Sequence, residues 1–261
     1  GSYCHVVEID LTNPQVCLKA VRSKDLGKPK RYTTFGSFVG QTRPLAAITG
    51  TFFDTATGHI ICNLVQDGKL LESGTVGHTL SLNEHNAPNW LVTAGKSGAG
   101  HNWKDSEFAV SSGPTLVRDG RIALNPWSEG FSDPGLFRQA ARTGLGTTRD
   151  GKLLMVSVNQ GVTLGRFARM MKALGCQDAL NLDGGSSTAL YARGRYLSKP
   201  RRKLTNVLMV VVRAKDPIPR LMHLEGEAIE VFTPFEEEED ENLEPAPEPA
   251  QIDLETLEIW L

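Results

Sequence analysis

The alternation of hydrophobic and polar residues predicts a chain built mainly from short strands. VVEIDL and VCLKAV, near the N-terminus, are apolar runs of strand length with a turn at Asn13-Pro14 between them. Further pairs of apolar runs are separated by the dipeptides Asp67-Gly68, Asp119-Gly120 and Asp150-Gly151. Because Asp-Gly favours the left-handed backbone of tight hairpin turns, this pattern predicts a largely antiparallel sheet.

One amphipathic helix is predicted over residues 163–174. Thr163 is a suitable N-cap, and Gly175 can end the helix in the left-handed conformation. The apolar residues at helical spacing, which we expect in the core, are Leu164, Phe167, Ala168, Met171 and Leu174. The helix lies between two apolar strands, so the sequence favours an α+β or α/β fold with a mixed, mostly antiparallel sheet.

Charge divides the chain into two parts. Residues 1–213 carry 26 Lys and Arg against 15 Asp and Glu, whereas residues 214–261 carry 2 against 15. The stretch EEEEDENLEPAPEP, residues 236–249, has too little apolar surface to fold alone. We therefore expect one domain over 1–213 and an acidic, largely disordered tail over 214–261. The tail either contacts the basic domain or only keeps the protein soluble.

A basic domain favours anionic partners such as phosphate, acidic glycans or nucleic acid, and the motifs narrow this choice. No nucleic-acid-binding motif is present, and no apolar run is long enough for a membrane helix. The 6 His residues have no metal-ligand spacing, and we expect no metal and no cofactor. The 4 Cys residues form no Cys-x-x-Cys pair, which leaves both thiols and disulfides open.

The stretch NLDGGSST, residues 181–188, carries the strongest chemical signal. Asp183 follows a buried strand, and Gly184 and Gly185 let the backbone approach a ligand and present consecutive amides to an anion. Hydroxyl donors follow at Ser186, Ser187 and Thr188. The alternative is a structural Asp-Gly turn in which a hydroxyl caps a short helix.

Three other segments offer candidate site residues. In AARTGLG, Arg142 precedes a buried strand together with Thr143; its guanidinium could hold a phosphate or form a structural ion pair, even with Asp183. In TGTFFD and SSGPTL, the residues that could line a pocket or only form turns are Thr49, Gly50, Phe53, Asp54, Ser112 and Gly113.

Taken in order, these segments resemble the phosphodiester glycosidase domain family. The resemblance covers about residues 5–213 and depends mainly on NLDGGSST with Arg-Thr some forty residues earlier. It implies a hydrolase that releases a sugar from a sugar-1-phosphodiester, a small-molecule or glycan substrate, and an extracytoplasmic setting. It also implies catalytic roles for Asp183, Arg142 and Asn181.

The chain departs from the family pattern at two places. Thr49-Gly50-Thr51 stands where the family often has Asn-Gly-Gly, and Asn159 stands where an Asp is usual. These changes favour an alternative, in which the same fold binds an anionic glycan without turnover. If the chain is an enzyme, Asp183 stabilises the sugar cation, activates water or acts as nucleophile, and the sequence does not choose among these roles.

Overall fold

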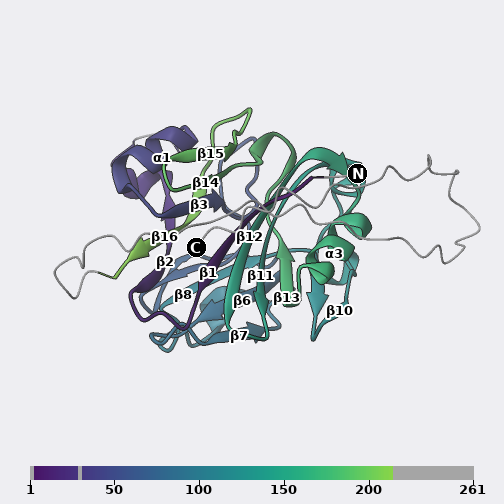
Figure 1. The fold of residues 1–261 in the computed structure, drawn as a ribbon, viewed down its shortest axis with the longest axis horizontal. Coiled ribbons are helices and arrows are strands. Elements are labelled where there is room, and N and C mark those ends of the chain that lie inside the picture. Colours follow the sequence, from purple (N-terminus) through teal and green to yellow (C-terminus); the bar gives the residue numbers. More distant parts are fainter. Residues whose placement is uncertain (1–2, 29–30, 214–261) are drawn as a thin grey trace, which may run out of the picture.

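The computed structural model describes residues 3–28 and 31–213. Within those residues the fold is mostly antiparallel β-sheet, in three sheets, with few helices (Figure 1). The acidic tail expected over 214–261, and its contact with the basic domain, lie outside the described residues. None of the described helices is both long and apolar enough to cross a membrane.

The first sheet has six strands in the order β1-β12-β11-β13-β9-β10, and all neighbours run antiparallel. The bounds are β1 (His5–Asp10), β9 (Thr115–Arg118), β10 (Arg121–Ile122), β11 (Ala140–Thr148), β12 (Lys152–Val162) and β13 (Cys176–Asn181). The helix expected over 163–174 is α3 (Leu164–Ala173), with Thr163 as its N-cap. It connects β12 to β13, which lie on either side of β11.

The second sheet has five strands in the order β15-β14-β3-β16-β2. The bounds are β2 (Val16–Arg22), β3 (Ala46–Thr49), β14 (Leu190–Ala192), β15 (Arg195–Ser198) and β16 (Asn206–Val212). The helix α1 (Phe35–Thr42) covers its outer face, where Phe38 packs on Val207 and Met209. The turn at Asn13-Pro14 therefore does not join two paired strands, because β1 belongs to the first sheet and β2 to the second.

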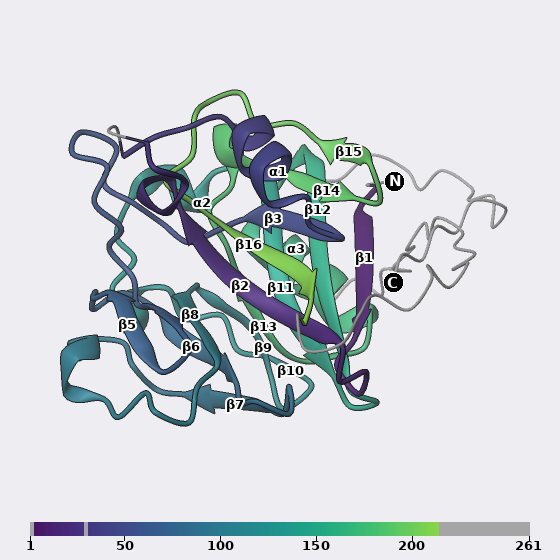
Figure 2. The same ribbon diagram turned by 90° about the vertical axis from the view of Figure 1, so that its left-hand side faces the viewer.

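The third sheet has five strands in the order β5-β4-β8-β6-β7 (Figure 2). The bounds are β4 (Leu64–Gln66), β5 (Lys69–Glu72), β6 (His78–Leu82), β7 (Pro88–Leu91) and β8 (Phe108–Ser112). The remaining short helices are η1 (Ser23–Leu26), η2 (Gly98–Gly100), η3 (Trp127–Glu129), α2 (Pro134–Phe137) and η4 (Gly185–Ser187).

One core joins the three sheets, and the central strands are buried on both faces. Along β12, Leu153 and Met155 point into the shared core, whereas Leu154 and Val156 point towards α3. Successive side chains of a strand face opposite sides, so a strand covered on both sides is a continuous apolar run. This explains why KLLMVSV and NVLMVVV lack the alternation of a half-exposed strand.

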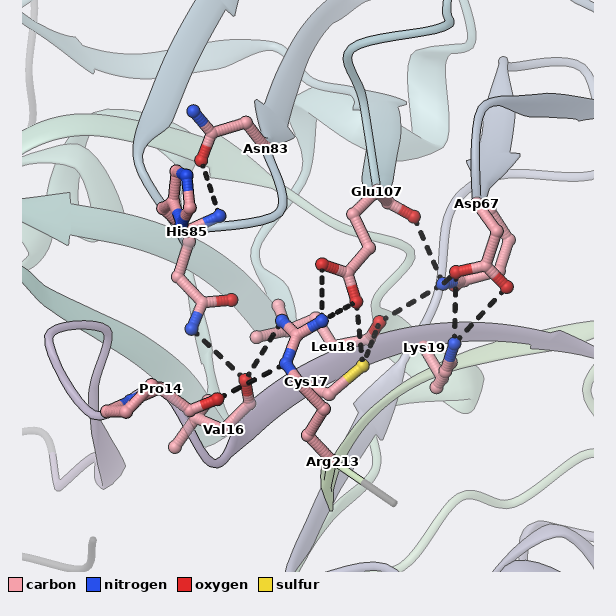
Figure 3. A network of polar contacts seen from close by, with 12 residues as sticks. Pro14, Val16, Cys17, Leu18, Lys19, Asp67, Asn83, His85, Glu107 and Arg213 are labelled. Atoms are coloured by element: carbon pink, nitrogen blue, oxygen red, sulfur yellow. Dashed lines mark hydrogen bonds and ion pairs between the residues drawn. The ribbon is translucent and has the colours of Figure 1, made fainter. Parts of the chain in front are cut away.

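Polar contacts fasten β2 to the third sheet (Figure 3). The Arg213 guanidinium donates to the Glu107 carboxylate at 2.6 and 2.8 Å, and the Cys17 thiol donates to the same carboxylate at 3.3 Å. Lys19 forms an ion pair with Asp67 at 3.1 Å. The four cysteines are buried, and none of them forms a disulfide with another: Cys4, Cys17, Cys62 and Cys176.

Candidate active site

The motif NLDGGSST begins at the end of β13 and continues into η4. The chain leaves the sheet at Asn181, and the Asp183 side chain is still buried, with 9% of its surface exposed. A carboxylate with so little access to water needs hydrogen-bond donors from the protein.

Three groups donate to the Asp183 carboxylate. Arg202 Nη2 donates to Oδ2 at 2.8 Å, and the Ser187 hydroxyl and the Gly184 amide also bond to the carboxylate. Burial raises the pKa of Asp183 above its ordinary value, although these three donors act in the opposite direction. A raised pKa makes the ionised carboxylate a stronger base.

Arg202 is a candidate site residue that the sequence analysis missed. Its Nε donates to the Ser187 hydroxyl at 2.5 Å, and its guanidinium carbon lies 4.6 Å from the centre of the Phe53 ring. Its side chain is 31% exposed, so it links the buried carboxylate of Asp183 to the surface. The available signal was the basic run KPRRK at 199–203, but a basic run is more often a solvated surface.

Hydrogen bonds to the main chain of Asp183 and its neighbour Leu182 bring two other predicted segments to this residue. The Asp183 amide donates to the Gly50 carbonyl at 3.2 Å, and the Thr143 hydroxyl donates to the Asp183 carbonyl. The Leu182 amide donates to the Thr143 carbonyl at 2.8 Å. The segments after β3 and within β11 therefore fix the position of the Asp183 backbone.

The segment SSGPTL supports the motif through Asn181. Ser112 Oγ donates to the Asn181 carbonyl at 2.8 Å, and Asn181 Nδ2 donates to the Gly113 carbonyl at 3.1 Å. Asn181 Oδ1 and Thr188 Oγ1 are buried and have no hydrogen-bond partner among the described residues. Most buried polar atoms are paired, so these two have hydrogen-bonding capacity to spare within the motif.

Gly50 is required by a close approach to Asn206. A Cβ at position 50 would lie 1.7 Å from Asn206 Oδ1. The Asn206 side chain accepts the Thr51 amide at 2.8 Å and donates to the Thr51 carbonyl at 3.0 Å. Asn206, at the start of β16, therefore holds the turn that presents the Gly50 carbonyl to Asp183.

Arg142 is buried, with 3% exposure, and bonds to main-chain carbonyls. Its Nε donates to the Val162 carbonyl at 3.2 Å, and its Nη2 donates to the carbonyls of Leu136 at 2.8 Å and Arg138 at 2.5 Å. The ion pair with Asp183 that the sequence left open is wrong, because Asp183 pairs with Arg202. Burial lowers the pKa of Arg142 to about 10.

Gly184 and Gly185 of the motif each require glycine, but for different structural reasons. A Cβ on Gly184 would lie 2.7 Å from the Ala141 carbonyl and 3.5 Å from Arg142 Cα, so this position packs directly on β11. Gly185 has a left-handed φ of 59°. The Ser186 carbonyl accepts the Arg201 amide at 2.8 Å, which connects the motif to the basic run.

Two of the predicted site residues, Thr49 and Asp54, are explained by their role in the fold. Thr49 is 1% exposed at the end of β3, so its side chain has almost no surface to offer a ligand. The exposed Asp54 carboxylate accepts the amides of Ala56 at 2.9 Å and Thr57 at 2.8 Å. Through these local bonds Asp54 stabilises the turn that follows it.

Two open pockets flank Arg202. The first, of about 340 Å³, has Tyr32 and Phe53 in its wall; we call it the inner pocket. The second, of about 460 Å³, has Tyr196, Lys199 and Arg201 in its wall; we call it the outer pocket. Arg202 and Lys203 line both. Within residues 3–28 and 31–213, no three His, Cys, Asp or Glu side chains come together as metal ligands.

The fold is similar to that of solved structures. A hypothetical protein from Synechocystis matches with a TM-score of 0.70 and 16% identity, over 80% of this chain and 59% of that chain. The zebrafish N-acetylglucosamine-1-phosphodiester alpha-N-acetylglucosaminidase catalytic domain, auto-inhibited by its pro-peptide, matches with a TM-score of 0.66 and 19% identity, over 80% and 83%.

Sequence comparison points in the same direction. The mouse N-acetylglucosamine-1-phosphodiester alpha-N-acetylglucosaminidase is 26% identical over an alignment of 176 residues, and the match covers 59% of this chain and 33% of the mouse protein. The chain thus spans about a third of the length of that relative. The profile of the phosphodiester glycosidase family matches residues 42–211, which run from before β3 to the next-to-last residue of β16. The chain therefore belongs to the phosphodiester glycosidase family.

Proposed function

We propose that this chain hydrolyses a sugar-1-phosphodiester, releasing the sugar and leaving the phosphate on its carrier. The observation that carries the proposal is the buried Asp183 carboxylate, which Arg202 holds at a glycine turn. The mouse relative is named for an N-acetylglucosamine phosphodiester, so N-acetylglucosamine is the first sugar to test. The resemblance also leads us to propose an extracytoplasmic setting.

In this reaction water attacks the anomeric carbon while the bond from that carbon to the phosphate oxygen breaks. The bonding electrons leave with the phosphate monoester, which is a stable anion and needs little help from a general acid. Asp183 takes the proton of the attacking water and stabilises the positive charge on the sugar. A carboxylate whose pKa is raised by burial is suited to accept that proton.

The phosphate is recognised by positive charge around the motif. Arg202 and the Gly185 amide are the donors we assign to it, since the Gly184 amide already bonds to the Asp183 carboxylate and Arg202 has further N–H groups. Arg142 adds a positive charge at the adjacent strand, and no carboxylate pairs with it among the described residues. A buried cation without a counterion favours an anion nearby.

The decisive experiment measures sugar release from a panel of glycosyl-1-phosphodiesters, with and without a chelator. The Asp183→Asn variant should lose about a hundredfold or more in kcat. Asp119→Asn, at a carboxylate whose side chain is 76% exposed, is the matched control and should keep its activity. Full activity in a folded Asp183→Asn protein would refute the assignment. Binding of the esters without turnover would favour a glycan-binding protein instead.

A further inference from the structure

The basic run KPRRK forms an exposed cationic surface next to the candidate active site. Lys199, Arg201 and Lys203 are exposed, whereas Arg202 turns inward to Asp183. Among the described residues, Arg202 is the member of this run that forms an ion pair with a carboxylate. Three neighbouring cations without acidic partners repel one another, and an anion would relieve that repulsion.

The structure holds the backbone of this run, and two of its side chains, in place. The Arg201 amide donates to the Ser186 carbonyl at 2.8 Å, and Arg202 Nε donates to the Ser187 hydroxyl at 2.5 Å. Lys199 Nζ lies 5.7 Å from the centre of the Tyr196 ring, within the range of a cation–π contact. The basic run is therefore fastened to the same turn that presents Asp183.

The two pockets meet at this run. The outer pocket opens on the side of α1, where Thr34, Phe35 and Gly36 form its far wall. Figure 2 shows α1 above the second sheet, close to β14 and β15. Arg202 and Lys203 line both pockets, and Arg202 also bonds to Asp183, so a ligand bound at Arg202 can extend from the inner pocket into the outer one.

We infer that the outer pocket binds further phosphate groups of the carrier, so that the substrate is a polyanionic glycosyl phosphodiester. This inference rests on the proposed function. The sugar occupies the inner pocket, the scissile phosphate lies at Arg202, and the next anionic groups contact Lys199 and Arg201. Each such contact is exposed, so it adds affinity through charge and is weakened by salt.

The test compares two esters of the sugar identified by the panel. One carries a methyl group on its phosphate, and the other carries a short oligomer of glycerol phosphate. Lys199→Ser with Arg201→Ser should lower kcat/KM for the oligomer ester about tenfold, while the methyl ester changes less than about twofold. Lys69→Ser with Lys104→Ser removes the same charge from exposed lysines of the third-sheet region and should change neither.

A binding measurement keeps this test independent of catalysis. The glycerol phosphate oligomer alone is titrated calorimetrically into the full chain, and the Lys199/Arg201 variant should bind it about tenfold more weakly than the Lys69/Lys104 control. Equal binding by the two variants overturns the inference even if the methyl ester is hydrolysed.

Failure of the methyl ester with the wild type overturns the proposed function instead, while the titration still decides the inference. Faster hydrolysis of both esters by the Lys199/Arg201 variant would indicate that the basic run binds acidic residues of this chain and not the substrate. This result would also overturn the inference.

Discussion

Replacing Glu129 by Gln should make the protein more stable at alkaline pH. Glu129 is 2% exposed, and its carboxylate accepts the Thr115 amide at 2.9 and 3.0 Å. No cation pairs with it in the described part of the chain. Burial raises the pKa of Glu129 to about 7 from the ordinary 4.5, because water solvates the charged form better than this site does.

The sign and size of the effect follow from proton linkage. Below about pH 4.5 Glu129 is protonated in both the folded and the unfolded chain, and its site has no charge to desolvate. Between about pH 4.5 and about 7 the unfolded chain has lost this proton while the folded protein still holds it, so the free energy of unfolding falls with rising pH, and above about 7 it is level. The interval between 4.5 and about 7 corresponds to a loss of about 3 kcal/mol.

The assay is urea unfolding followed by the fluorescence of the chain's 4 tryptophans, at intervals from about pH 4 to about pH 8. Relative to the wild type, the free energy of unfolding of Glu129→Gln should rise by about 3 kcal/mol across this range. Glu84→Gln, at a side chain that is 80% exposed, is the control and should follow the wild-type curve. A constant difference between Glu129→Gln and the wild type would refute the reasoning.

Three further predictions follow from the packing. Gly50→Ala should lose about 3 kcal/mol of stability and most activity, because the new methyl group displaces the Asn206 amide from its two bonds; unchanged urea unfolding would contradict this. Glu107→Gln should cost about 1–2 kcal/mol but preserve the activity of the folded protein, since it weakens only the bonds to Arg213 and Cys17; lost activity would place this network in the site. The four buried cysteines should react with a thiol reagent only after denaturation; burial raises the pKa of Cys62 to about 12, and labelling of the native protein would refute its burial.

The sequence predicted where helices and strands lie better than it predicted which strands pair with one another. The stripe from Leu164 to Leu174 specified α3, because apolar spacing along one helix is local information. The assignment of β1 and β2 to different sheets could not be predicted, since a turn at Asn13-Pro14 is compatible with pairing and with crossing between sheets. Which strands pair depends on contacts that are distant along the chain.

The same limit applies to the site. The motif predicted Asp183 as a candidate because a carboxylate before two glycines is a local pattern. Its partner Arg202 comes from another element, and nothing in KPRRK distinguishes the inward arginine from its exposed neighbours. For Arg142 the sequence offered a phosphate contact or an ion pair, whereas its carbonyl partners at Leu136, Arg138 and Val162 depend on how the chain turns around β11.

The bonds that assemble the site join residues far apart in the chain, and this affects how the protein folds. Thr51 and Asn206 are separated by 155 positions, Ser112 and Asn181 by 69, and Thr143 and Asp183 by 40. Contacts at such separations form late and slowly, because a long stretch of chain must be closed before any of them forms. We therefore expect refolding chains to regain secondary structure before they regain ligand binding. Recovery of ligand binding would then report that the whole fold is complete. A single cut in an exposed loop between these segments would lower ligand binding and the stability of the fold together.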